Sequence, residues 1–374
     1  MIALRALVSV NVGAIERNVA LLAAQAPTAL LCAVVKADGY GHGSSEAATA
    51  ALRGGAAWLA VSTAAEAQTL RSARIEAPIL VMGALTEDEL KLALSAEADV
   101  VAWSEFFVER LAALGGGRVH IKLDTGMGRL GTRDRELATR LAQQAVEAPQ
   151  IELVGLMTHF ATADELGDSF FDQQLAAFSD WTEEVAATAP GLIRHAANSA
   201  ALLRDSASHF DLVRPGVACY GLDPFGRDPA GRGLEPAMEV SSYVACIEQC
   251  EAGESSGYGR SFIAEQATFI GTVPIGYADG WKRVFSNNAE LLIAGRRFPV
   301  VGNVSMDNTT VDLGADGGGV KLGDRVTLLG TDGDARLLSE ELAARAGTIN
   351  YEIVTSFSAR VPRRYLADAL GGDR

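Results

Sequence analysis

Ala33-Val-Val-Lys-Ala-Asp-Gly-Tyr-Gly-His-Gly43 joins an apolar run to a glycine-rich turn, and the rest of the chain follows the same plan. Residues 29–35 carry no charge, and Lys36 ends the run. Glycine lets a turn approach a ligand closely. A lysine at the end of a buried strand is partly desolvated, which lowers the pKa of its amine and makes it a usable nucleophile or base. A single lysine in such a place is more often a surface residue, so the other strand ends decide the interpretation.

Apolar runs alternate with helix-like segments from residue 12 to about residue 215. The runs are continuous, as is typical of parallel strands that are covered on both sides. They lie at residues 29–35, 57–61, 78–82, 98–102, 119–123, 151–157, 192–196 and 210–213. Such a series of strand–helix units predicts an α/β fold, a (β/α)8 TIM-type barrel. A doubly wound open sheet is the alternative, but its Gly-x-Gly-x-x-Gly fingerprint is missing.

Three helix signals support this order. Ile15, Val19 and Leu22 lie on one face of the first helix pattern. The capping boxes Thr63-Ala-Ala-Glu66 and Thr86-Glu-Asp-Glu89 predict the starts of two further helices.

A stretch rich in Gly, Pro, Asp and Arg near residues 226–233 predicts a linker. We therefore expect the barrel in residues 1–230 and a mostly β C-terminal domain in residues 231–374. The alternating segment Leu4–Val10 pairs either with the C-terminal domain or with the barrel. The C-terminal domain has one predicted helix, at 339–347, and predicted strands at 238–248, 267–273, 291–293, 298–301, 306–313 and 325–329.

Composition limits the partners and the compartment. The net charge of −15 disfavours nucleic acid and anionic membrane surfaces as partners. No apolar run is long enough for a membrane span, and the start of the chain lacks the pattern of a signal peptide. Cys32, Cys219, Cys246 and Cys250 show no metal-ligand spacing and are expected to be reduced and mostly buried. These features predict a cytoplasmic protein.

Polar side chains follow five of the predicted barrel strands. Catalytic groups of such barrels come from the C-terminal ends of the strands, so these residues are expected to meet at one mouth. His120 lies within its strand and is assigned to packing. The strand-end segments are Lys36, Lys122–Gly131, Met157–Phe160, His195–Ser199 and Val213–Gly216.

The residue types at this mouth suggest a ligand. Ser199 precedes a predicted helix, and its hydroxyl with neighbouring N–H groups could hold a phosphate. Gly216 and Val217 follow the eighth strand, the usual phosphate position in these barrels. A lysine amine, a phosphate cradle and a stacking histidine, His159, together fit pyridoxal phosphate.

On these residues the chain resembles the alanine racemases, the barrel family of pyridoxal-phosphate enzymes. The resemblance covers both domains, from about Leu4 to Tyr365. Its motifs stand in family order: Val34–Gly43, Lys122–Arg129, Thr158–Phe160, Asn198–Ala200, Val213–Gly216, Gly257–Arg260, Pro274–Gly280, Met306–Asp307 and Asn350–Glu352.

The resemblance implies a role for each matching residue. Lys36 carries pyridoxal 5′-phosphate and is one catalytic base, and Tyr258, from the partner subunit of a homodimer, is the other. Arg129 and the Met306 backbone N–H hold the substrate carboxylate. Lys122 matches a lysine that the family carbamylates; an ordinary ion pair with Asp124 is the alternative. The implied cofactor-binding residues are Lys36, Tyr40, His159, Asn198, Ser199, Arg214, Gly216, Val217 and Tyr351.

The chain departs from the family pattern in Gly302-Asn-Val-Ser-Met-Asp307. Asn303 stands where relatives often have an arginine that lines the entrance, and Ser305 stands where they have a cysteine. Neither change touches the two proposed bases, but both affect the charge and selectivity of the entrance.

The resemblance implies an isomerase that interconverts L- and D-alanine and supplies D-alanine for bacterial peptidoglycan. A barrel-type decarboxylase of basic amino acids is an alternative, but those enzymes place a carboxylate at the pyridine nitrogen, where this chain has Arg214. A non-catalytic pyridoxal-phosphate carrier would not need the β domain with Tyr258. A racemase of broader substrate range remains open.

Overall fold

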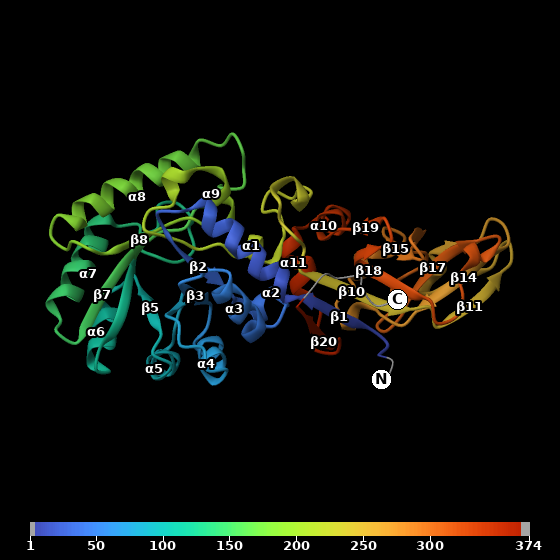
Figure 1. Ribbon diagram of the computed structural model, residues 1–374, viewed down its shortest axis with the longest axis horizontal. Helices are drawn as coiled ribbons and strands as arrows, with labels where there is room; N and C mark the ends of the chain where they lie inside the picture. Colours follow the sequence, from blue (N-terminus) through green and yellow to red (C-terminus); the bar gives the residue numbers. More distant parts are fainter. Residues whose placement is uncertain (1–3, 368–374) are drawn as a thin grey trace. The chain divides into compact units, whose positions relative to one another are not determined.

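The computed structural model describes residues 4–367 and divides the chain into two compact units (Figure 1). The first unit runs from Ile15 to Cys219, and the second combines the residues up to Ala14 with those from Tyr220 onward. The sequence places the boundary at residue 230, within the segment rich in Gly and Pro. That segment belongs to the second unit, where Arg232 forms an ion pair with the buried Asp223.

The first unit is a parallel barrel, as predicted. Its strands are β2 (Leu30–Val34), β3 (Trp58–Val61), β4 (Ile79–Val81), β5 (Asp99–Ala102), β6 (Gly117–Lys122), β7 (Ile151–Met157), β8 (Ile193–His195) and β9 (Leu212–Val213). They form an 8-stranded sheet in the order β8-β7-β6-β5-β4-β3-β2-β9. Between β9 and β8, Asp211 N donates to Arg194 O at 3.0 Å and Arg214 N to Ala197 O at 2.8 Å. These bonds join the two ends of the sheet, so the doubly wound alternative is wrong.

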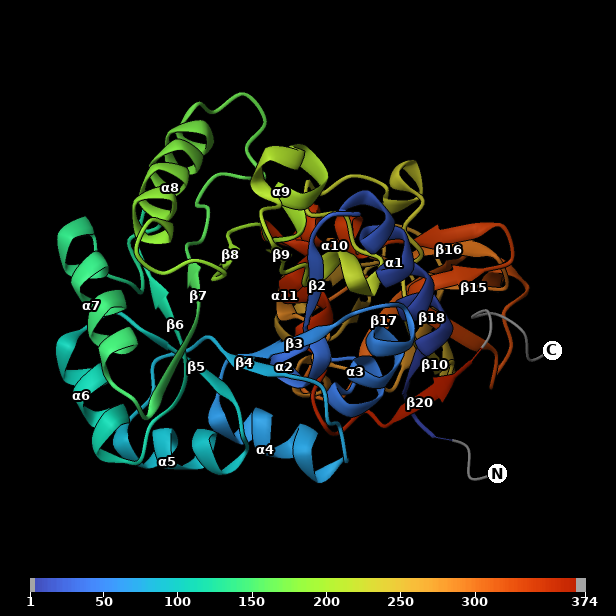
Figure 2. The same cartoon turned by 60° about the vertical axis from the view of Figure 1, so that its left-hand side comes forward.

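Helices follow the strands and cover the outside of the barrel (Figure 2). Thr63 and Thr86 form the two predicted capping boxes, because each hydroxyl accepts the N–H three residues on while the glutamate there accepts the cap N–H. Ile15, Val19 and Leu22 are all buried, as their spacing predicts. The helices are α1 (Val12–Gln25), α2 (Lys36–Tyr40), α3 (Ser44–Arg53), α4 (Ala64–Ser72), α5 (Glu87–Ser95), α6 (Glu105–Ala113), α7 (Arg135–Glu147), α8 (Phe170–Ala186), α9 (Ser199–Arg204), and the 3-10 turns η1 (Ser206–Ser208) and η2 (Val217–Tyr220).

The second unit is mostly β. Its largest sheet has seven strands: β16 (Arg296–Pro299), β15 (Glu290–Ile293), β18 (Arg325–Asp332), β10 (Met238–Tyr243), β1 (Leu7–Asn11) and β20 (Arg363–Leu366), with β19 (Ala335–Leu337) paired to β18. A three-stranded sheet contains β11 (Cys246–Cys250), β14 (Thr268–Val273) and β17 (Thr309–Gly314), and β12 (Ser255–Ser256) pairs with β13 (Phe262–Ile263). The helical segments are α10 (Ser339–Ala346), α11 (Asn350–Thr355), η3 (Pro229–Arg232), η4 (Tyr258–Arg260), η5 (Tyr277–Asp279), η6 (Arg283–Phe285) and η7 (Gly317–Gly319).

In this unit the structure corrects one predicted strand and decides where the N-terminal segment pairs. The run 238–248, predicted as one strand, is broken into β10 and β11, which belong to different sheets. The N-terminal strand β1 pairs antiparallel with β10 and parallel with β20, so this segment belongs to the C-terminal domain. The sequence of each segment predicts a strand but not its neighbours, so only the tertiary structure fixes these partners.

Cys32, Cys219 and Cys250 are buried, and all four cysteines are free. Within residues 4–367, no helix has both the length and the apolar character that crossing a bilayer requires.

Candidate active site

Directly after Lys36 the backbone makes a left-handed turn. Ala37, Asp38, Gly39 and Tyr40 all have positive φ, between 53° and 59°. Only glycine adopts this conformation freely, and each other residue costs about 1–2 kcal/mol there. Strain of this kind persists where the surrounding structure holds it, and it is concentrated at functional sites.

Three side chains hold this turn. Ala37 N donates to Glu66 Oε1 at 2.7 Å, and Ser44 N donates to Asp38 Oδ1 at 2.9 Å. His42 Nδ1 lies 3.0 Å and 2.9 Å from two carbonyl oxygens of the turn, so this nitrogen carries the proton. The turn is therefore fixed relative to helix α4, which carries Glu66.

Lys36 lies at the carboxyl end of β2, half-buried. Burial lowers the pKa of its amine, and the charge of Arg129 lowers it further, while Glu66 opposes the shift. A larger neutral fraction makes this amine a better nucleophile and base than an exposed lysine.

Tyr40, Ser199, Gly216 and Val217 form a small polar cradle. A Cβ on Gly216 would lie 2.3 Å from the Tyr40 hydroxyl, so the tyrosine packs against a site that only glycine fits. Ser199 Oγ accepts Gly216 N at 2.9 Å and Ala218 N at 3.3 Å. Val217 is buried, and its N–H has no acceptor among the described residues. Hydroxyls and backbone N–H groups in this arrangement suit a phosphate.

Asn198 precedes Ser199 and caps the helix on which Ser199 lies. Its Oδ1 accepts Ala201 N at 2.9 Å, so the side chain caps helix α9. This cap fixes the start of the helix on which Ser199 lies, and Asn198 therefore orients the cradle.

A buried hydrogen-bonded chain runs across the barrel to Arg214. Arg214 Nη1 lies 2.8 Å from His195 Nδ1, His195 Nε2 lies 2.8 Å from His120 Nδ1, and His120 Nε2 lies 3.1 Å from Asp99 Oδ2. Arg118 Nε donates to the other Asp99 oxygen at 2.8 Å. His120, assigned from sequence to packing alone, is the central link.

The donor chemistry fixes the tautomers of both histidines. Arginine only donates, so His195 Nδ1 must accept and its Nε2 carries the proton. That proton is donated to His120 Nδ1, and His120 Nε2 donates to Asp99. Burial lowers the pKa of His195 well below its usual value, helped by Arg214, and burial also lowers the pKa of His120. Both rings are therefore neutral.

Arg214 itself is almost completely buried. Burial lowers the pKa of its guanidinium to about 10, so the group is still charged at neutral pH. Its Nη2 donates to Thr158 O at 2.8 Å and to Ala196 O at 3.1 Å, and lies 3.4 Å from His159 Nδ1. The pKa of His159 lies well below its usual value, first through burial and then through Arg214 and three other cations. Those cations are Lys122, Arg129 and Lys36, so the predicted strand-end residues do gather at one mouth.

Lys122 is buried at the end of β6. Burial lowers the pKa of its amine to about 8, with further contributions from Arg214 and Arg129. Asp124 accepts N–H bonds from Gly126 and Gly128, and within residues 4–367 it forms no ion pair with Lys122. The charge of Asp124 still opposes the lowering of the Lys122 pKa, so an ordinary pairing of the two residues stays an alternative to a carbamate.

Arg129 lies in the exposed loop after β6, and among the described residues its guanidinium has no hydrogen-bond or ion-pair partner. Gln174 of α8, which sequence reasoning missed, supports this region. Its amide nitrogen lies 3.2 Å from both Thr125 Oγ1 and His159 O, and its oxygen accepts Ala161 N at 2.8 Å. The sequence signal that could have identified Gln174 is its position on the apolar face of an amphipathic helix, where a buried amide must find hydrogen-bond partners.

The second unit contains the remaining predicted residues. Tyr258 lies in η4 with 75% of its surface exposed, and Asn303 Nδ2 donates to its carbonyl oxygen at 2.6 Å. Met306 is also exposed, and Tyr351 lies half-buried in α11. Asn303, the departure from the family pattern, thus anchors the turn that carries Tyr258, so the expectation that this change touches neither proposed base is wrong for Asn303.

Two family models match most of the chain. The model described as alanine racemase, N-terminal domain, matches residues 10–224, and the model described as alanine racemase, C-terminal domain, matches residues 237–365.

Relatives and solved structures agree with these matches. An alanine racemase from Frankia casuarinae is 40% identical over 375 residues, which cover 97% of each chain. The structure of alanine racemase from Streptomyces coelicolor has a TM-score of 0.93 at 36% identity and covers 97% of this chain and 98% of that chain. The alanine racemase from Bartonella henselae, solved with covalently bound pyridoxal phosphate, has a TM-score of 0.87 at 30% identity, covering 97% of this chain and 100% of that chain.

Proposed function

The chain belongs to the alanine racemase family, and from this premise we propose that it interconverts L- and D-alanine with pyridoxal 5′-phosphate bound through Lys36. The observation that carries the proposal is the group of four cations at one mouth of the barrel, three of them buried or partly buried, next to the strained turn after Lys36.

The residues at this mouth fit the cofactor. The Lys36 amine, whose pKa burial lowers, would bond to its aldehyde carbon, while Tyr40, Ser199, Gly216 and Val217 would hold its phosphate. His159 would support the ring, and Tyr351 would complete the phosphate site. When bound, pyridoxal phosphate withdraws electron density from the substrate Cα and makes its proton easier to remove.

Arg214 favours racemisation over competing reactions. A guanidinium only donates hydrogen bonds, so a pyridine nitrogen facing it stays unprotonated. An unprotonated ring would withdraw electrons more weakly, which would favour proton exchange at Cα over loss of carbon dioxide or of the amino group. The hydrogen-bonded chain behind Arg214 fixes the direction of the guanidinium.

Two bases exchange the proton. Lys36 Nζ would act on one face of Cα and the Tyr258 hydroxyl of a partner subunit on the other, because a single base serves only one face well. Arg129 and the Met306 N–H would hold the substrate carboxylate. A carbamate on Lys122 would supply a negative charge beside Arg129. The enzyme would be a cytoplasmic homodimer that provides D-alanine for peptidoglycan.

The test uses the purified protein loaded with pyridoxal phosphate. We expect visible absorbance that survives dialysis and conversion of either alanine enantiomer to the racemate, measured by chiral chromatography. Lys36→Ala should lose both. A panel of other amino acids separates a broad racemase from an alanine racemase, and release of carbon dioxide from lysine or arginine would instead favour the decarboxylase. A wild-type protein that cannot retain the cofactor would contradict the proposal.

A further inference from the structure

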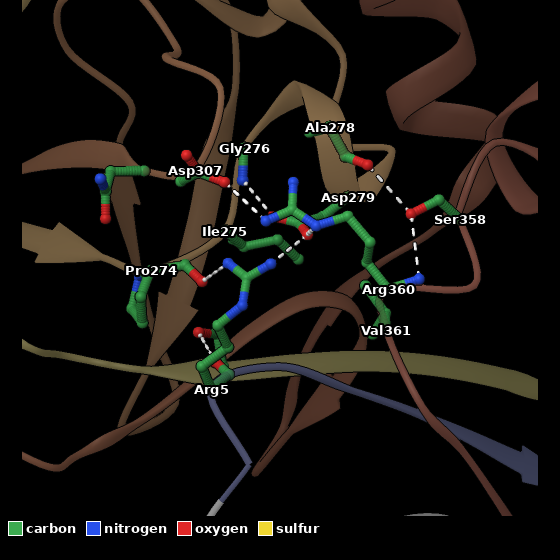
Figure 3. A network of polar contacts seen from close by, with 12 residues as sticks. Arg5, Pro274, Ile275, Gly276, Ala278, Asp279, Asp307, Ser358, Arg360 and Val361 are labelled. Carbon is green, nitrogen blue, oxygen red and sulfur yellow. Dashed lines mark hydrogen bonds and ion pairs between the residues drawn. The ribbon is translucent and has the colours of Figure 1, made fainter.

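A fully buried carboxylate, Asp279, joins separate segments of the second unit (Figure 3). Its Oδ1 accepts a hydrogen bond from Arg5 Nη2 and lies 3.6 Å from Arg360 Nε. Its Oδ2 accepts Gly276 N at 3.0 Å. A buried charge with this many partners is costly to disturb, because removing one partner leaves the others unpaired.

Both arginines extend the network. Arg5 Nη1 donates to Pro274 O at 3.0 Å, at the start of the loop that carries Asp279. Arg360 Nη2 donates to Asp307 Oδ1 at 2.7 Å. Asp307 directly follows Met306, so the network connects Asp279 to the loop at 305–308.

The two loops are also bonded to each other. Tyr277 N donates to Ser305 O at 3.0 Å, and Ala278 N donates to Met306 O at 3.1 Å. A Cβ on Gly276 would lie 2.3 Å from Ser305 O and 2.6 Å from Met306 O. At Gly276 the two loops are in direct backbone contact, with no space for a side chain. A shift of the 274–280 loop must therefore move the 305–308 loop.

The loop at 305–308 has two free donors. Ser305 N donates to Asn308 O at 2.9 Å, and Asn308 N donates to Ser305 Oγ at 3.0 Å. Among the described residues, the N–H groups of Met306 and Asp307 have no acceptor. Two successive free N–H groups are suited to an anion, but the Asp307 carboxylate beside them would repel one. Arg360 offsets that charge.

We propose that Asp279, Arg5 and Arg360 are positioning residues for the substrate carboxylate. Asp279 fixes the 274–280 loop, this loop fixes Met306 through two backbone bonds, and Arg360 both neutralises Asp307 and holds it in place. The inference rests on the proposed function in one respect, that the Met306 N–H binds the carboxylate.

The test compares Asp279→Asn and Arg360→Met with the wild-type protein, all loaded with pyridoxal phosphate. The probe is propionate, which has the carboxylate and methyl group of alanine but no amine, and its binding is measured by calorimetry. We expect the Kd of propionate and the KM of alanine to rise about tenfold, the loss of a hydrogen bond to a charged group. The kcat should change less than twofold, and cofactor content should not change.

Arg336→Met is the matched control. Arg336 forms a 2.8 Å ion pair with Asp228 in the same unit, and the two side chains are 49% and 45% exposed. The Arg360–Asp307 pair, at 2.7 Å, is 46% and 48% exposed. Loss of an ordinary surface pair should leave the Kd of propionate unchanged.

Hydrogen exchange at Tyr277 and Ala278 gives a readout that does not depend on activity. We expect Arg360→Met and Asp279→Asn to show faster exchange together with weaker propionate binding. Arg336→Met should show neither. Faster exchange with unchanged propionate binding would reduce the network to a structural role, and unchanged exchange would overturn the coupling of the loops. A wild-type protein that binds propionate but does not racemise alanine would refute the proposed function and leave this inference standing.

Discussion

At the scale of single residues, burial next to other cations sets the chemistry of the barrel mouth. Burial lowers the pKa of the Lys36 amine and lowers that of Lys122 to about 8, while Arg214 remains charged with a pKa of about 10. Desolvation disfavours each charge, and the neighbouring guanidinium groups add to the effect for the lysines. A desolvated arginine keeps its proton and a desolvated lysine loses it more readily, which is why the lysines are the proposed reactive groups.

Lys122 should take up carbon dioxide. The neutral amine attacks the carbon, an N–C bond forms, and one proton leaves to solvent, so that Lys122 becomes a carbamate anion close enough to interact with the charges of Arg129 and Arg214. With ¹³C-labelled bicarbonate, we expect a carbamate signal in the NMR spectrum that grows as the pH rises through about 8, because only the unprotonated amine reacts.

The control for this prediction is Lys91. Ion pairing with Glu87 and Asp88 raises the pKa of its amine, which keeps it protonated. Lys122→Met should abolish the signal and Lys91→Met should leave it unchanged. A signal that survives in Lys122→Met would assign the carbamate to another amine.

At the scale of elements, the capping box of helix α4 also forms a hydrogen bond outside its own helix, unlike the similar box of α5. In both capping boxes a glutamate accepts the N–H of the cap threonine. Glu66 also accepts Ala37 N with Oε1 and Ser62 N with Oε2. Within residues 4–367, Glu89 accepts hydrogen bonds from Thr86 alone, through Oε2. Glu66 of helix α4 therefore supports the strained turn after Lys36, and Glu89 supports the start of its own helix.

Replacing each glutamate with glutamine separates these tasks. A glutamine at residue 89 keeps one carbonyl acceptor on a fully exposed side chain and should leave the free energy of unfolding nearly unchanged. At residue 66 the amide must turn an NH2 group toward one of the N–H donors, so we expect a loss of about 1–2 kcal/mol. Only Glu66→Gln should also weaken cofactor retention, measured from visible absorbance after dialysis. Equal effects of the two changes would mean that Glu66 does not hold the turn.

At the scale of the whole molecule, the two proposed bases lie in different units. Lys36 belongs to the barrel, and Tyr258 lies on an exposed turn of the β unit. If Tyr258 serves the site of a second subunit, each active site combines residues of two chains across a two-fold contact.

Mixed dimers test this arrangement. Lys36→Ala and Tyr258→Ala proteins should each be nearly inactive alone. When they are unfolded together and refolded, half of the dimers are mixed and each rebuilds one intact site, so activity should recover to roughly one quarter of the wild-type level. Mixed dimers confirmed by mass but inactive would show that both bases serve a site within one chain.

The sequence alone determined the order of the barrel strands and the helix caps. Continuous apolar runs, apolar residues recurring with the helical period of 3.6, and capping boxes are all signals within a short segment of sequence. A parallel strand covered on both faces shows the same continuous apolar run whatever its place in the sheet. The strand-end residues were predictable for the same reason, because parallel strands bring their carboxyl ends to one mouth.

Only the tertiary structure decided what depends on contacts between distant residues. Which strands pair along their edges decides three features of the fold. These are the position of β1 beside β10 and β20, the break between β10 and β11, and the domain division at Cys219. The hydrogen-bonded chain from Asp99 through His120 and His195 to Arg214 links residues of four strands or strand ends. The sequence pointed to His195 and Arg214 at strand ends but assigned the linking His120 to packing. Hydrogen bonding of buried polar groups is obligatory, but the sequence does not say which partners satisfy it; the fold does, by bringing the strands side by side.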